Sequence, residues 1–96
     1  MEAVYSLRRG DAEALEAVAH GDRKSSRVIG RRIEEVTLPA GAQIGALVRG
    51  EGADGQVIIP HHDTVIETDD HIVIFIPNKR MVREVERLFQ VGAMFL

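Results

Sequence analysis

The sequence predicts an α+β fold in which a small, mostly antiparallel sheet is covered by a C-terminal amphipathic helix and a short helical turn. Two runs of branched and aromatic residues, 57–59 and 72–76, fit buried strands, and a proline follows each run. Because proline has no N–H for a strand ladder, Pro60 and Pro77 mark strand ends. After Pro77 the apolar residues recur at helical spacing, namely Met81, Val82, Val85, Leu88 and Phe89. Two strands followed by an amphipathic helix therefore form the predicted skeleton of a two-layer fold.

Size and composition limit the class of protein. The chain has 96 residues, which form one hydrophobic core but not two, so we expect a single domain over 1–96. The absence of cysteine excludes disulfides and thiolate metal sites and suits a reducing cytoplasm. No stretch reaches the roughly 20 apolar residues of a membrane span. The net charge of −3 argues against nucleic acid as a partner.

The first part of the chain predicts one clear strand and one ambiguous segment. Apolar residues cluster at 3–7, which indicates a short strand. Residues 11–21 are rich in alanine, leucine and glutamate, which favour helix, but the apolar positions also fit a strand. The residues alone leave this choice open.

A short helical turn is predicted over 30–36, because apolar residues recur at i, i+4 and i+7 from Ile29. Ser25 and Ser26 precede this turn. A catalytic pairing of either serine with His20 lacks a strained G-x-S-x-G elbow. We therefore expect the serines to cap the turn by accepting hydrogen bonds from its first N–H groups.

Residues 43–59 predict a β-hairpin with a loose, glycine-rich tip at 50–55. In the first strand Ile44, Ala46 and Val48 alternate with their neighbours, which is the period of a strand with one buried face.

Several short motifs follow one another in a fixed order. They are a serine-flanked Val-Ile-Gly at 28–30, Leu-Pro at 38–39, Ile-Gly-Ala at 44–46, Val-Arg-Gly at 48–50, Ile-Pro at 59–60, Thr-Val-Ile at 64–66, and the final strand and helix. This ordered set resembles the C-terminal subdomain of the RCK family, called the TrkA-C domain. The likeness covers nearly the whole chain and is greatest to the proteobacterial branch, which forms the last domain of Trk potassium-uptake regulatory proteins.

The resemblance implies a function. It implies a non-catalytic regulatory domain that dimerises and couples ligand state to the gating of a membrane potassium channel. The implied partners are a second copy, neighbouring RCK subdomains and the channel subunit, at the inner face of the membrane. It also implies that 1–96 is a fragment of a longer cytoplasmic protein. It favours strand over helix for 13–19.

No cofactor is expected within this fragment. RCK proteins carry NAD or another nucleotide in a separate Rossmann-type subdomain, and the G-x-G-x-x-G fingerprint of such a site is missing from this sequence.

Arg49 is the candidate ligand-binding residue, together with Ile44 and Ala46 of the strand before it. In some relatives this strand lines a dimer-interface pocket for a cyclic dinucleotide, with the arginine near phosphate. The resemblance thus implies an alternative function, a small-molecule sensor for an anionic nucleotide. A guanidinium suits that role because it makes paired bonds to phosphate. We favour a surface arginine at a strand end, since the proteobacterial branch is not the one tied to cyclic dinucleotides.

Two polar clusters are weaker candidates. His61, His62 and Asp63 have metal-binding side chains, but neighbours on an extended loop point apart, so we expect a solvated loop. Glu67, Asp69 and Asp70 lack the spacing of a calcium loop and a partner for acid–base catalysis, so we expect a turn.

Two further features are expected to affect local structure. Asp69 stands where many relatives have glycine, which matters if the turn needs a positive φ angle. The apolar tail at 93–96 is expected to pack on the core or on a partner.

Overall fold

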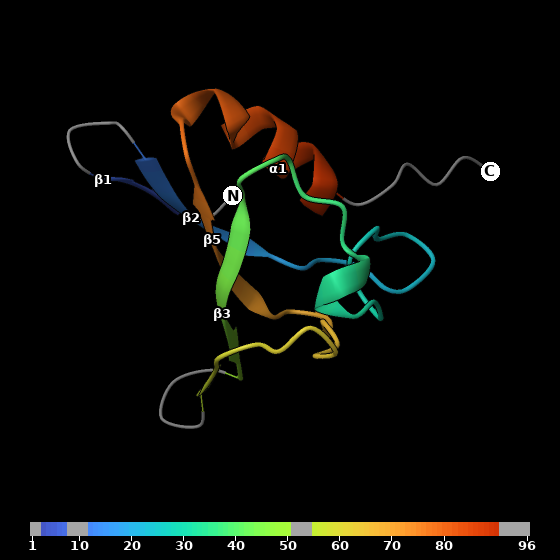
Figure 1. Ribbon diagram of the computed structural model, residues 1–96. Coiled ribbons are helices and arrows are strands. Elements are labelled where there is room, and N and C mark those ends of the chain that lie inside the picture. Colours follow the sequence, from blue (N-terminus) through green and yellow to red (C-terminus); the bar gives the residue numbers. More distant parts are fainter. Residues whose placement is uncertain (1–2, 8–11, 51–54, 91–96) are drawn as a thin grey trace.

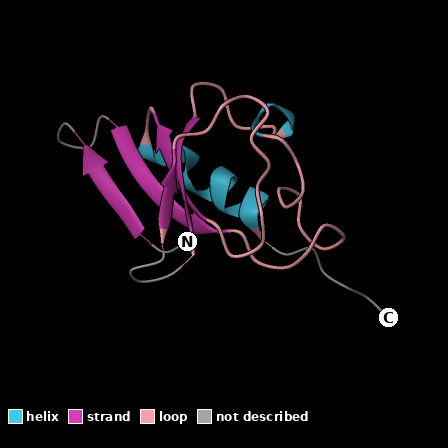
Figure 2. Ribbon diagram, turned by 90° about the horizontal axis from the view of Figure 1, so that it is seen from below, coloured by secondary structure: helices cyan, strands magenta, loops and turns pink. Residues whose placement is uncertain are grey.

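The computed structural model describes residues 3–7, 12–50 and 55–90, and these form a sheet with one α-helix against it (Figures 1 and 2). The described residues give a five-stranded, wholly antiparallel sheet in the order β1-β2-β5-β3-β4. The strands are β1 (Ala3–Leu7), β2 (Ala12–Val18), β3 (Gln43–Arg49), β4 (Gln56–Ile58) and β5 (His71–Ile76). The helices are α1 (Val82–Phe89) and the 3-10 turns η2 (Ile33–Glu35) and η4 (Lys79–Met81). The predicted fold class is confirmed, whereas the glycine-rich tip at 51–54 and the tail at 93–96 lie outside the described residues.

The core lies between the sheet and α1. Ile72, Ile74 and Ile76 of the central strand β5 face this side and are buried, while the residues between them face the other side. Val85 and Phe89 supply the buried positions of α1. Each such side chain contributes roughly 1.5–3 kcal/mol of transfer free energy, so the sheet and the helix stabilise each other.

Residues 12–18 form a strand despite their helical propensity. β2 is paired on both sides, with β1 and with β5, and its Leu15 and Ala17 are buried in the core. Tertiary pairing outweighs the small local preference of alanine and glutamate for helix. The strand that the family resemblance favoured is therefore confirmed.

The segment between β2 and β3 packs against the turn that precedes β5. Gly30 donates its N–H to the carbonyl of Ile66, and Ile33 donates to that of Thr64. The predicted helical turn appears as η2. The residue that precedes η2 is Arg32 and not a serine, so the serines do not cap that turn. Buried Ser26 instead stabilises the turn before it, since its Oγ accepts hydrogen bonds from the N–H groups of Val28 and Ile29.

β3 departs from the strict alternation that the sequence suggested. Ile44 and Leu47, three residues apart, both face the core, because the register with β5 shifts between Ile44 and Ala46. Such a bulge turns the following residues to the opposite face. A side chain at Gly45 would overlap the ring of Phe75, which lies across this position. The expectation that Ile44 and Ala46 share one face was therefore wrong.

Candidate functional site

Arg49 at the end of β3 binds the carboxylate of Asp70, which directly precedes β5. The Nε atom donates to Oδ1 at 2.9 Å and an Nη2 hydrogen donates to Oδ2 at 2.8 Å. The side chain of Asp70 is fully buried, whereas that of Arg49 is 29% exposed. Paired bonds of this kind combine charge with fixed geometry and are among the strongest in proteins. They raise the pKa of Arg49 above its ordinary value, and the charges of Asp70 and Glu67 act in the same direction.

The remaining donors of Arg49 hold the turn at 65–70. Nη2 also donates to the carbonyl of Val65 at 3.0 Å, and Nη1 lies 2.9 Å from Oε2 of Glu67. The second oxygen of Asp70 accepts a further bond from the N–H of Glu67. One guanidinium therefore bridges a strand end, a carbonyl and two carboxylates.

The same turn is tied to the end of β2. Ala19 donates its N–H to the carbonyl of Asp70, and Asp69 donates to the carbonyl of Ala19. Asp69 has φ 67°, the left-handed region that favours glycine. The turn thus needs the positive φ angle that the glycine of many relatives would supply.

The three predicted ligand residues do not converge. Ile44 is buried in the core, Ala46 faces the other side of the sheet, and the guanidinium of Arg49 is engaged by Asp70 and Glu67. The anion-binding role of Arg49 stays a prediction, which now requires the guanidinium to exchange a buried carboxylate for a phosphate.

No described helix covers the sheet face opposite α1 (Figure 2). We call it the open sheet face, and its apolar residues are Ala46, Val48, Val57, Val73 and Phe75. The ion pair of Glu16 and His71 lies beside them on the same face. Strand partners share a face, and the register pairs Ala46 with Val73 and Val48 with Val57. Phe75 is 46% exposed and Val57 is 65% exposed. A contiguous apolar face of this kind is typical of an interaction surface.

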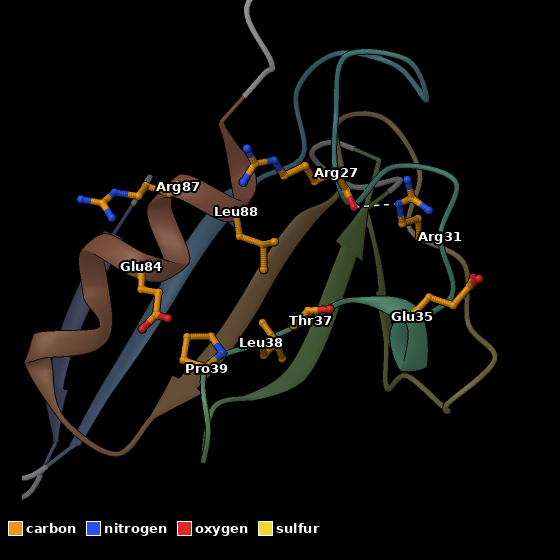
Figure 3. A pocket seen from close by; sticks show the side chains of 9 residues that line it. All are labelled: Arg27, Arg31, Glu35, Thr37, Leu38, Pro39, Glu84, Arg87 and Leu88. Atoms are coloured by element: carbon orange, nitrogen blue, oxygen red, sulfur yellow. Dashed lines mark hydrogen bonds between the residues drawn. The ribbon is translucent and has the colours of Figure 1, made fainter.

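A groove of about 530 Å³ lies between α1 and the chain from η2 to Pro39 (Figure 3). We call it the basic groove, because three arginines, Arg27, Arg31 and Arg87, line it. Leu38, Pro39 and Leu88 form its apolar floor, and Glu35, Thr37 and Glu84 complete the lining.

Comparison with known proteins identifies the family. Residues 23–90 match the family described as the TrkA-C domain. The chain belongs to the TrkA-C family. This confirms the resemblance carried by the motifs, and the match takes in Arg49, Asp70 and Phe75.

Relatives of this TrkA-C domain share most of its length. It is 57% identical over 93 residues to the Trk system potassium uptake protein TrkA of Vibrio alginolyticus and 55% identical over 92 residues to that of Halomonas elongata. The protein of the same name from Haemophilus influenzae is 48% identical over 93 residues. These matches take in 96–97% of the chain but 19% of each relative, so the chain spans about a fifth of the length of the curated relatives it matches.

The other candidate residues of this TrkA-C domain are exposed loop residues. His61, His62 and Asp63 lie in a turn in which Oγ1 of Thr64 accepts a hydrogen bond from the N–H of His61. Within 3–7, 12–50 and 55–90, no group of three or more His, Cys, Asp or Glu side chains is arranged to hold a metal ion. No helix in the described part of the chain is long and apolar enough to cross a membrane.

Sequence reasoning treated Asp70 as a turn residue and missed its pairing. The sequence offered one signal of the pairing: an arginine ends one apolar strand and an aspartate precedes another. The two residues are 21 positions apart, and this separation does not show that they are neighbours. Strand order, which the sequence does not reveal, brings them together.

We predict that Asp70→Asn lowers the free energy of unfolding by about 2–3 kcal/mol, because an amide has no charge and only one acceptor oxygen, so it cannot replace the paired bonds to a partly buried guanidinium. Urea denaturation followed by circular dichroism measures the change. Glu67→Gln is the matched control, since Glu67 binds the same guanidinium but is 59% exposed, and it should cost less than about 1 kcal/mol. Equal losses in the two variants would contradict the special role of the buried pair.

We predict that Asp69→Gly raises the free energy of unfolding by roughly 0.5–1 kcal/mol, because glycine adopts the left-handed conformation without a steric cost. The gain is reduced by the larger backbone freedom of glycine in the unfolded chain. Asp69→Ala keeps the Cβ atom and serves as the control in the same denaturation experiment. A Gly variant no more stable than the Ala variant would show that the φ angle is not strained.

Proposed function

We propose that this chain is a non-catalytic, dimerising regulatory domain of a longer cytoplasmic protein of a Trk potassium-uptake system. In this role it couples the ligand state of neighbouring RCK subdomains to a membrane potassium channel. The relatives are each named a Trk system potassium uptake protein, and these names support the assignment to a Trk potassium-uptake system. The open sheet face supports the dimer, and it is the observation on which the proposal chiefly rests.

The open sheet face suits a second copy of the same chain. A two-fold axis brings identical patches together, so an apolar patch is automatically matched by an apolar patch. Phe75 is the natural anchor, because it is the largest side chain of the patch and an exposed aromatic ring buries a large area on contact. Its ring is held in place by the bare backbone of Gly45 beneath it.

Regulation would then be geometric. Two domains paired through their sheets hold the attached parts of two longer chains at one spacing. A ligand that binds more tightly at one spacing than at another shifts the equilibrium by its difference in affinity. The domain needs no catalytic group for this role. Its location at the inner face of the membrane would follow from contact with the channel.

The alternative is a sensor for an anionic nucleotide at the dimer interface near Arg49. The contacts of Arg49 disfavour it, because a phosphate would have to displace Asp70 and leave a buried carboxylate without its cation. The partial exposure of Arg49 keeps one side of the guanidinium within reach of solvent.

We predict that the chain sediments as a dimer at tens of micromolar and that Phe75→Glu converts it to a monomer, because each copy would bury an unpaired carboxylate in an apolar interface. Analytical ultracentrifugation measures the change. Val65→Glu is the matched control, since Val65 is 42% exposed but lies outside the sheet, paired with Arg32. A wild-type monomer, or equal loss of dimer in both variants, would contradict the proposed interface.

We predict that calorimetric titration with a cyclic dinucleotide gives no binding heat, because the donors of Arg49 are already engaged. Binding that is lost in Arg49→Ala but kept in Arg83→Ala would instead establish the sensor. Circular dichroism of each variant checks that the fold is retained.

A further inference from the structure

The basic groove holds positive charge that the domain itself does not neutralise. All three of its arginines are exposed, and none forms an ion pair with another described residue. Arg31 instead donates its Nε hydrogen to the carbonyl of Arg27. The groove thus offers three guanidiniums to an outside partner.

Glu35, a carboxylate of the groove lining, mainly binds Arg32 and interacts more weakly with the charge of Arg31. Oε1 of Glu35 accepts hydrogen bonds from the backbone N–H and the Nε of Arg32, which lower the pKa of Glu35. Arg32 also binds Glu34. Glu35 and Glu84 both line the groove, so its three arginines meet two carboxylates, one of which already binds Arg32. The lining keeps an excess of one positive charge.

The positions of the arginines point to an elongated ligand. Figure 3 shows Arg87 on the α1 side, with its guanidinium directed away from Arg31, which lies on the loop side. An elongated ligand suits guanidiniums that point in different directions. A chain of negative charges running along the groove meets each arginine in turn.

The wall opposite α1 includes a short stretch of main chain without internal backbone hydrogen bonds. Val36 has an extended backbone, with φ −81° and ψ 120°, and the chain continues through Thr37 and Leu38 outside any helix or strand. Neither Thr37 nor Leu38 shares a backbone hydrogen bond with another described residue. Free N–H and C=O groups on an extended segment are what an added peptide strand pairs with. Nucleotides and inorganic phosphate make no such ladder.

We propose that the basic groove binds an extended acidic peptide segment of a partner protein. Its carboxylates contact the groove arginines, its backbone pairs with Thr37 and Leu38, and one apolar side chain rests on the floor formed by Leu38, Pro39 and Leu88. The groove lies on the α1 side of the molecule, away from the open sheet face. A dimer therefore binds two such segments, one on each outer side.

The test uses a fluorescent ten-residue peptide in which aspartates flank a single leucine. A control peptide has asparagine in place of every aspartate, which removes the negative charges. Anisotropy should detect binding of the aspartate peptide, weakened by added salt because the charges are exposed. The double variant Arg27→Gln, Arg87→Gln should bind the peptide roughly tenfold more weakly. Each exposed ion pair between an arginine and a peptide carboxylate accounts for about two- to fivefold. Arg83→Gln should leave binding unchanged, because Arg83 is exposed on the same helix but does not line the groove.

Nuclear magnetic resonance locates the site independently. The amide signals of Thr37 and Leu38 should shift on addition of the aspartate peptide but not on addition of inorganic phosphate or pyrophosphate. The proposal would be overturned by any of four results. These are equal binding of the asparagine peptide, equal weakening by Arg83→Gln, displacement of the peptide by pyrophosphate, and no binding of the aspartate peptide at millimolar concentration. Sedimentation of the Arg27 and Arg87 variants should still give dimers, so failure here is distinct from failure of the dimer proposed above.

Discussion

The paired hydrogen bonds between Arg49 and Asp70 are the constraint on which the rest of the structure depends. They join the end of β3 to the start of β5, and the same turn binds the end of β2 through Ala19. Three neighbouring strands are therefore fixed relative to one another at one end of the sheet. A buried carboxylate without its cation would be costly, so arrangements of the turn that separate Asp70 from Arg49 are disfavoured. The arrangement with the pair intact sets the register that puts the isoleucines of β5 under α1 and Phe75 on the opposite face.

The two faces of this sheet have different consequences. The face that α1 covers provides the hydrophobic core. The opposite face is not needed for the core, so it is available for interaction. Gly45 links the two, because the bulge there keeps Ile44 in the core while turning Ala46 outward and leaving room for the ring of Phe75. The apolar residues of β3, β4 and β5 thus belong to two surfaces, one that stabilises the domain and one that suits a second copy.

Much of this fold could be predicted from the sequence. The apolar runs at 57–59 and 72–76, the two prolines and the helical stripe indicated the skeleton, because their periods are local properties. The expected burial of 57–59 was wrong, since Val57 and Ile59 are exposed on and beside the edge strand β4. The strand at 12–18 required the family resemblance, since local propensity favours helix. The bulge could not be predicted, because the ring that crosses Gly45 comes from a strand far along the chain. The burial of Asp70 could not be predicted either, since it depends on which strands are neighbours. The basic groove was missed because it forms only when α1, which carries Arg87, packs beside the chain that carries Arg27 and Arg31 and leads to Pro39.

The central claim is that two copies meet through the open sheet face, and distances between spin labels test it most directly. The chain has no cysteine, so a single cysteine introduced at Val57 or at Arg83 carries one label per copy. If the copies pair through their sheets, labels at Val57 lie closer together across the dimer than labels at Arg83, which are separated by both helix layers. A shorter distance between the Arg83 labels, or no measurable interaction at Val57 in a sample that sediments as a dimer, would contradict the account.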